Sequence, residues 1–194
     1  MSGKSRNLIG ALIVVAVIVG VGVLLTRSQQ STSGNLGSIE QPTSKDQIRE
    51  VSVNGEFVRG EIVPEAAFSD FEGNSYNLSD FEGKAVVLDF WAGWCPFCIN
   101  EMPELQSAQD EFGDELVMIG VHRTDTEDPD VGLKFAEERG VTYLLVSDDG
   151  TLYRAAGGFG MPVAVFIDKE GVVTEIKSGP KTKEEIKGKI EALI

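Results

Sequence analysis

The residues best suited to chemistry are the two cysteines of the chain, Cys95 and Cys98, which lie in the segment WCPFC. Two cysteines at this spacing, at the start of a helix, bring their sulfur atoms close enough to form a disulfide. The dipole and free amides of the helix N-terminus stabilise a thiolate, so the pKa of Cys95 should fall below its ordinary value of about 8.5. With Pro96 as the first helical residue, Cys95 is predicted to attack a partner protein and Cys98 to resolve the mixed disulfide.

A cysteine pair at this spacing can also serve two other functions. Half a zinc site needs two further ligands, and outside the pair the chain offers only one histidine, His122. A purely structural disulfide would close a very short loop, where the gain in chain entropy is least. His122 ends a predicted strand and is interpreted as a surface residue. The sequence therefore predicts a redox-active disulfide that needs no metal or organic cofactor.

One predicted strand and one predicted helix must position the cysteines. The strand is AVVLDFWA, Ala85 to Ala92, whose nearly continuous apolar run is typical of a central strand covered on both faces. The helix runs from Pro96 to about Phe112, where apolar residues recur at helical spacing. Because the chain passes directly from the strand to the helix, WCPFC lies at their junction.

The remaining elements complete an α/β domain. Strands are predicted at 115–121 and 142–146, a helix at 132–140, a hairpin around the turn 168–171, and a last helix capped by Thr182 with Glu185. The alternation of strands and helices predicts parallel pairing, and the hairpin adds antiparallel pairing. We therefore expect a central mixed β-sheet with helices on both faces.

The N-terminal region has a different composition. Leu8 to Leu25 consists only of Ala, Val, Ile, Leu and Gly, and as a helix it spans about 27 Å, close to the hydrocarbon thickness of a bilayer. Lys4 and Arg6 precede the run, which places the N-terminus in the cytoplasm and the rest of the chain outside. Residues 1–27 are predicted to be an uncleaved, single-pass anchor in the cell membrane. A cleaved secretory signal is the alternative, and it also exports the domain.

Between the anchor and the compact domain, residues 28–59 are predicted to be a flexible extracytoplasmic linker, because few large apolar residues occur there. Within it, VSVNGEFV, Val51 to Val58, favours a short hairpin around Asn54 and Gly55. The compact domain then covers residues 60–194. The chain has 31 acidic and 17 basic side chains, a net charge of −14, which argues against nucleic acid as a partner.

The segment VVLDFWAGWCPFCINEMPEL resembles the active-site segment of the thioredoxin superfamily. The domain from about Gly60 onward is similar to the membrane-anchored TlpA/ResA/DsbE-like branch, and it shares YNLSDFEGKAVVL, the helical unit around Phe135, and GMPVAVFIDKEGVV with that branch. The resemblance implies a thioredoxin fold. It also implies that Pro162 is a cis-proline facing the CxxC, and that Met161 offers its backbone to the substrate chain.

Two acidic residues are candidates for handling the proton of Cys98. Asp89 lies inside the apolar central strand, where a carboxylate must be neutral, paired or reached by solvent. Glu101 follows Cys98 by three residues and lies on the same side of the helix. The resemblance implies a proton-relaying acid at one position or the other. We hypothesise that Asp89 is the main base, and the alternatives are an exposed edge-strand Asp89 and a solvated Glu101.

Two aromatic residues flank the cysteines. Trp94 and Phe97 are expected to be exposed and, together with Pro96, to receive a polypeptide substrate, whereas Trp91 and Met102 are predicted to lie in the core.

These observations predict a membrane-tethered thiol-disulfide oxidoreductase. The resemblance implies exported cysteine-containing proteins, such as apocytochrome c, as substrates, and a membrane electron carrier or quinone-linked protein that recycles the enzyme. The sequence favours a reductant of the cytochrome c maturation type, because CPFC lacks a cation that would stabilise the thiolate. An oxidase of secreted proteins is the alternative. A peroxiredoxin-like peroxidase is less favoured, because Cys95 stands where that family has Thr, and a metallochaperone lacks ligands.

Overall fold

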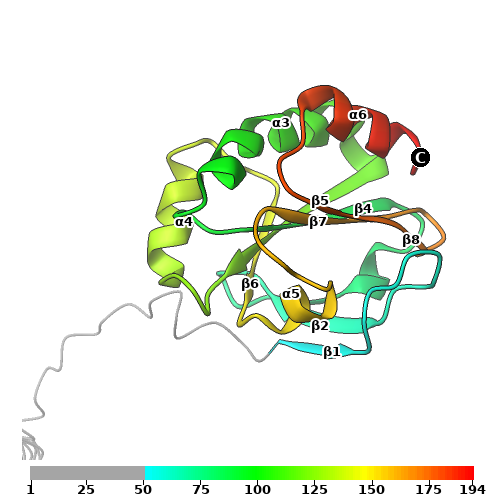
Figure 1. The fold of residues 1–194 in the computed structure, drawn as a ribbon, viewed down its shortest axis with the longest axis horizontal. Helices are drawn as coiled ribbons and strands as arrows, with labels where there is room; N and C mark the ends of the chain where they lie inside the picture. Colours follow the sequence, from blue (N-terminus) through cyan, green and yellow to red (C-terminus); the bar gives the residue numbers. More distant parts are fainter. Residues whose placement is uncertain (1–50) are drawn as a thin grey trace, which may run out of the picture. The chain divides into compact units, whose positions relative to one another are not determined.

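A five-stranded sheet in the order β6-β5-β4-β7-β8 organises the computed structural model (Figure 1). The structure describes residues 51–194. The predicted membrane anchor and most of the predicted linker lie outside these residues. Within residues 51–194, no helix has both the length and the hydropathy needed to cross a membrane.

The central strand of this sheet is β4 (Ala85–Trp91), and all of its residues are buried. On one side it pairs in parallel with β5 (Leu116–Arg123), which pairs in parallel with β6 (Leu144–Asp148). On the other side it pairs antiparallel with β7 (Val163–Ile167), which pairs antiparallel with β8 (Val173–Ser178). The predicted mixed sheet is therefore confirmed, including the central place of β4.

Three helices cover one face of this sheet. Helix α3 (Pro96–Phe112) and helix α6 (Lys183–Glu191) lie side by side above it in Figure 1. Their buried residues, such as Leu105 and Ile186, belong to the same apolar cluster as Val87 of β4. Helix α4 (Pro129–Glu137) contributes Ala136 to the cluster around the two cysteines. The predicted helix from Pro96 to about Phe112 is confirmed. The predicted capping box of Thr182 with Glu185 is also confirmed.

The opposite face is covered mainly by a second sheet. It is antiparallel, in the order β1 (Ser52–Asn54), β2 (Glu65–Ser69), β3 (Ser75–Asn77). The short 3-10 helix Leu78–Phe81 and helix α5 (Thr151–Ala155) complete this layer, while a second 3-10 helix, Gly113–Glu115, precedes β5. The prediction of helices on both faces is thus correct only in part, because a small sheet supplies most of this layer.

The predicted hairpin at Val51 to Val58 is wrong. Strand β1 pairs instead with β2, in a register that joins Val53 to Ala66. Val51 and Phe57 are buried in the main apolar cluster, and the N–H of Phe57 donates to the carbonyl of Ala155. The domain core therefore includes residues before Gly60, because these apolar side chains pack on the face of the central sheet that lies opposite to α3 and α6.

Candidate active site

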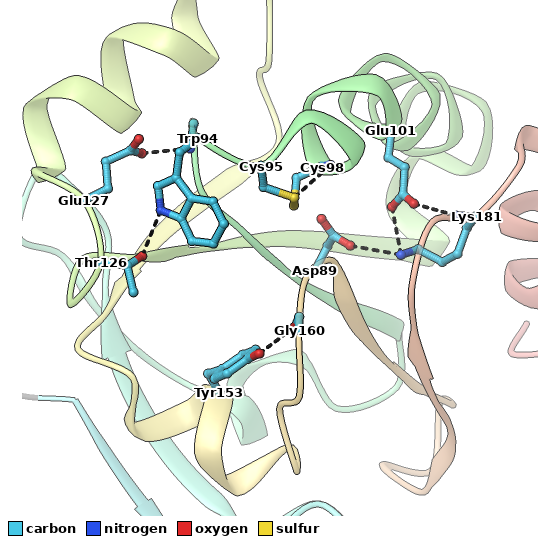
Figure 2. Close-up of a disulfide and its surroundings, with 11 residues drawn as sticks. Asp89, Trp94, Cys95, Cys98, Glu101, Thr126, Glu127, Tyr153, Gly160 and Lys181 are labelled. Atoms are coloured by element: carbon cyan, nitrogen blue, oxygen red, sulfur yellow. Dashed lines mark hydrogen bonds and ion pairs between the residues drawn. A yellow bond between two sulfur atoms is a disulfide. The ribbon is translucent and has the colours of Figure 1, made fainter.

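Cys95 and Cys98 form a disulfide at the N-terminus of α3, with their Cα atoms 5.3 Å apart (Figure 2). Cys95 is the N-cap of the helix, and its Sγ accepts the N–H of Cys98 at 3.2 Å. Pro96 is the first helical residue, as predicted. Both cysteines are buried, but Cys95 keeps 3% of its surface exposed and Cys98 keeps none. A partner protein can therefore reach only Cys95.

Three charged side chains are buried together beside Cys98. Asp89 of β4, Glu101 of α3 and Lys181 before α6 are all at most 5% exposed. The Nζ of Lys181 lies 2.8 Å from Oε2 of Glu101 and 3.4 Å from Oδ1 of Asp89. In Figure 2 the carboxyl group of Asp89 points into the space between the disulfide and Lys181. The alternatives of an exposed Asp89 and a solvated Glu101 are therefore wrong.

Burial and charge shift the proton affinities of this cluster. Burial raises the pKa of Asp89 from 3.8 to about 7, while attraction to Lys181 lowers it and repulsion from Glu101 raises it. Burial by itself would lower the pKa of Lys181, but attraction to Asp89 and Glu101 outweighs it, so this pKa lies above 10.5. Asp89 therefore exchanges its proton near neutral pH, beside a lysine that stays charged.

Lys181 was not found by sequence analysis. It stands in the segment GPKTK directly before the cap of α6, where a lysine is ordinarily exposed, and its neighbour Lys183 is indeed exposed. Its backbone N–H donates to Oε1 of Glu101, 80 residues earlier in the chain. Only the tertiary fold brings the two together, so no local pattern could reveal the contact.

The loop before Cys95 is held by the segment that follows β5. Oε2 of Glu127 accepts the N–H of Gly93 at 2.8 Å, and Oγ1 of Thr126 accepts Nε1 of Trp94 at 3.2 Å. The same Glu127 oxygen lies 2.8 Å from Nε2 of His122. Figure 2 draws the bonds of Glu127 and Thr126 to the loop, and these bonds hold the active-site loop in position.

His122 is not the surface residue that the sequence predicted. It is fully buried, and its ring packs against Trp91 with centroids 4.5 Å apart. Burial lowers its pKa below 6.5, although the bond to Glu127 acts in the opposite direction. The prediction failed because α4 covers the end of β5, with Gly132 directly against the imidazole ring.

Exposed aromatic residues occur next to the cysteines and before the cis-proline. Trp94 and Phe97 are each 55% exposed, as predicted, whereas Trp91 and Met102 are buried, also as predicted. A third aromatic, Phe159, is 91% exposed and precedes the cis-proline by three residues. Phe159 was not predicted, because its only signal in the sequence is a large apolar residue between two glycines.

The peptide bond between Met161 and Pro162 is cis, as the resemblance implied. Met161 packs against the cluster that contains Cys95 and Cys98, which places this loop beside the disulfide. The carbonyl of Pro162 accepts the N–H of Gly179, two residues before Lys181. The cis-proline loop and the buried charges are thus joined through one short segment.

A metal centre finds no support in the described part of the chain, because no group of three or more His, Cys, Asp or Glu side chains there is arranged to hold an ion. Asp89 and Glu101 are joined by Lys181, which is not a metal ligand while it is protonated.

A CxxC disulfide that caps the helix after the central strand, beside a cis-proline, defines a thioredoxin-like thiol-disulfide oxidoreductase. The model of the AhpC/TSA family matches residues 59–176, and the chain belongs to that family. Enzymes of this kind use their own redox-active cysteines and need no cofactor.

Named relatives agree with this class. The thiol-disulfide oxidoreductase ResA of Geobacillus thermodenitrificans is 37% identical over 139 residues, which cover 69% of this chain and 77% of that protein. A putative thiol:disulfide interchange protein DsbE from Chlorobium tepidum has a TM-score of 0.65 at 27% identity and covers 71% of this chain and 99% of its own. An exposed lipoprotein thioredoxin of Streptococcus pneumoniae has a TM-score of 0.57 at 30% identity, with 66% and 99% covered. The chain is thus a thiol-disulfide oxidoreductase of the ResA/DsbE type, and the peroxidase alternative is not better supported.

Proposed function

We propose that this protein is a membrane-tethered, extracytoplasmic reductant of disulfides in exported proteins. The observation that carries the direction of the reaction is the charge beside Cys98, where two buried carboxyl groups face a single lysine. Carboxylates disfavour a thiolate on the neighbouring Cys98, and a couple becomes more reducing when its reduced form gains less stabilisation as a thiolate. The dipeptide between the cysteines, Pro96 and Phe97, adds no cation.

The reaction begins when the reduced enzyme meets a substrate disulfide. The thiolate of Cys95, stabilised by the N–H of Cys98 and the helix N-terminus, attacks one substrate sulfur. A mixed disulfide forms, and the other substrate sulfur leaves as a thiolate that takes up a proton. Cys98 then attacks Sγ of Cys95, which releases the second substrate sulfur and leaves the disulfide seen in the structure.

Asp89 is the proposed base for the second step. Cys98 is fully buried, so its proton needs an acceptor inside the protein. The carboxyl of Asp89 points toward the disulfide in Figure 2, and burial places its pKa at about 7. A base with this pKa accepts a proton at neutral pH and returns it to solvent afterwards.

The exposed aromatic residues form the proposed substrate surface. Trp94 and Phe97 next to the cysteines, and Phe159 three residues before the cis-proline, offer exposed apolar area that suits an unfolded polypeptide carrying cysteines. Beside them, Met161 of the cis-proline loop offers backbone groups to an extended chain. Apocytochrome c is one such exported substrate, and a membrane electron carrier or quinone-linked protein returns electrons to the disulfide.

The proposed location rests on the N-terminal sequence. The apolar run Leu8 to Leu25, preceded by Lys4 and Arg6, is typical of an anchor with a cytoplasmic N-terminus. The pneumococcal neighbour is an exposed lipoprotein, which also supports a catalytic domain outside the cytoplasm.

A trapping experiment on the full chain tests this function. The Cys98→Ser variant keeps the attacking thiol but cannot resolve, so it should accumulate mixed disulfides with exported proteins that dithiothreitol releases. The matched Cys95→Ser variant keeps only the deeply buried thiol and should trap none. Equal trapping by both variants, or trapping of cytoplasmic proteins alone, would contradict the proposal.

A further inference from the structure

Lys181 is a buried cation that the reaction described above does not use. Its side chain has no exposed surface, and it reaches two carboxyl groups from different elements, Asp89 on β4 and Glu101 on α3. A lysine is almost never buried without a partner, and here the partners are the candidate base and the acid one helical turn from Cys98. This arrangement places a fixed positive charge at the point where the proton of Cys98 must be received.

The three groups do not interact equally. Glu101 holds Lys181 twice, because Oε1 accepts its backbone N–H and Oε2 lies 2.8 Å from its Nζ. Asp89 has only the longer contact of 3.4 Å to Nζ. Glu101 thus orients the ammonium group, while Asp89 remains able to gain and lose a proton beside it.

We propose that Lys181 is a positioning residue of the redox centre, which sets the proton affinity of Asp89 and thereby the rate at which Cys98 resolves the mixed disulfide. The inference rests on the proposed role of Asp89 as the base. In the resolving step, the Cys98 thiol gives its proton to Asp89 and the Cys98–Cys95 bond forms. The bond between Cys95 and the substrate breaks, and the substrate sulfur leaves with the electron pair as a thiolate. Lys181 gains and loses no proton in this step and acts through its charge alone.

The charges facing Lys181 come from each element packed around it. These groups are the carboxyl groups of Asp89 and Glu101 and the buried hydroxyl of Tyr143. Burial raises the pKa of Tyr143, and repulsion from the two acids raises it further. Attraction to Lys181 opposes the effect of burial on Asp89, whereas Glu101 reinforces it. Removal of Lys181 and removal of Glu101 must therefore move the proton affinity of Asp89 in opposite directions.

The same segment contacts the substrate side of the site. The N–H of Gly179 donates to the carbonyl of Pro162 at 2.9 Å, so the chain that carries Lys181 is fixed to the cis-proline loop. The backbone around Lys181 is therefore held by two bonds, one from Gly179 to Pro162 and one from its own N–H to Glu101.

The test is the pH dependence of resolution, measured on the full chain. The reduced protein is mixed with oxidised glutathione, and the lifetime of the glutathionyl intermediate on Cys95 is followed by acid quench and mass spectrometry from pH 5 to 10. Lys181→Met should move the midpoint of the pH profile up by about one pH unit and slow resolution at pH 7 about fivefold, because Asp89 then holds its proton more tightly. Glu101→Gln should move the midpoint down. Lys183→Met, two residues away in an exposed pair with Glu104, should leave the profile unchanged.

A double variant separates the inference from the function on which it rests. If Lys181 acts through Asp89, the profile of Lys181→Met combined with Asp89→Asn equals that of Asp89→Asn alone. Midpoint shifts of the same sign in Lys181→Met and Glu101→Gln, or no shift in either, overturn the role of Lys181 while a slow Asp89→Asn variant still supports the base. An unchanged Asp89→Asn variant overturns the base itself. Should Lys181→Met fail to fold, the downward shift in Glu101→Gln decides, and its absence contradicts the proposal.

Discussion

The Sγ of Cys95 accepts the backbone N–H of Cys98 at 3.2 Å, so the first cysteine caps the helix that carries the second. In the reduced protein the same position offers a thiolate a hydrogen bond and the positive end of the helix dipole. The two cysteines are therefore inequivalent before any substrate arrives, since Cys98 lies deeper and beside carboxyl groups.

The first prediction concerns this inequivalence. In the reduced protein, the pKa of Cys95 should lie below about 8.5 and below that of Cys98, because only Cys95 has the helix N-terminus. The rate of alkylation by iodoacetamide as a function of pH measures it, with Cys98→Ser reporting Cys95 and Cys95→Ser reporting Cys98. A higher pKa for Cys95 than for Cys98 would contradict the assignment of the attacking sulfur.

The second prediction concerns stability and pH. Because burial raises the pKa of Asp89 to about 7, the folded protein binds this proton more tightly than the unfolded chain does. Its contribution to the free energy of unfolding is full below pH 3.8 and is lost as the pH rises through 7, with a slope of up to about 1.4 kcal/mol per pH unit. Urea unfolding of the oxidised protein between pH 4 and 8 should show this slope reduced in Asp89→Asn.

Asp114→Asn is the matched control for that experiment, because Asp114 is exposed. It should keep the slope of the unmodified protein. An equal slope in the unmodified protein and in Asp89→Asn would show that Asp89 does not hold its proton as described.

The third prediction concerns the support of the active-site loop. A Cβ atom at Gly132 would lie 2.2 Å from two atoms of the His122 ring, so Gly132→Ala must displace α4 or the ring. Displacing His122 also disturbs Glu127, which holds the N–H of Gly93. The free energy of unfolding should fall by about 1–3 kcal/mol, and disulfide reduction of insulin should slow.

Gly188 offers the matched control, since it is an exposed glycine in α6 with no atom within 4 Å of an added Cβ. Gly188→Ala should raise the free energy of unfolding by about 0.5–1 kcal/mol, as expected for a helix interior. If Gly132→Ala were equally stabilising, the packing of α4 on His122 would be refuted.

The fourth prediction concerns the aromatic surface. Trp94→Ala, Phe97→Ala and Phe159→Ala should each lower kcat/KM for an unfolded protein substrate, by about tenfold for a residue that dominates the contact. Reaction with the small disulfide of oxidised glutathione should change little. Ile62→Ala, at a similarly exposed apolar residue before β2, is the control. Equal losses on both substrates would show that these rings stabilise the site rather than receive a chain.

The strand, the helix and the cysteine junction could be predicted from sequence because their signals are local. The apolar run of β4 and the helical spacing of α3 extend over neighbouring residues, and the structure places both as expected. Residues 51–58 were misassigned, since the Asn54-Gly55 turn signal was local while the partner strand, β2, lies further along the chain.

The residues of the site that could not be predicted from sequence owe their positions to tertiary contacts. Lys181 reaches Glu101 across 80 residues of sequence, and its neighbours give it the pattern of an exposed helix start. His122 is buried only because Gly132 lets α4 approach its ring. Asp89 could be identified because a carboxylate inside an apolar strand departs from the local pattern. Lys181 could not, because a lysine in a polar loop fits its local pattern.

The reduction potential of the Cys95–Cys98 couple tests the central claim most directly. The full chain in detergent is equilibrated with dithiothreitol or glutathione buffers, and the oxidised fraction is read by alkylation and mass spectrometry. The carboxyl groups beside Cys98 predict a value of about −270 mV, the range of a thioredoxin-like reductant. A value close to about −120 mV would contradict the account and identify an oxidant that makes disulfides in exported proteins.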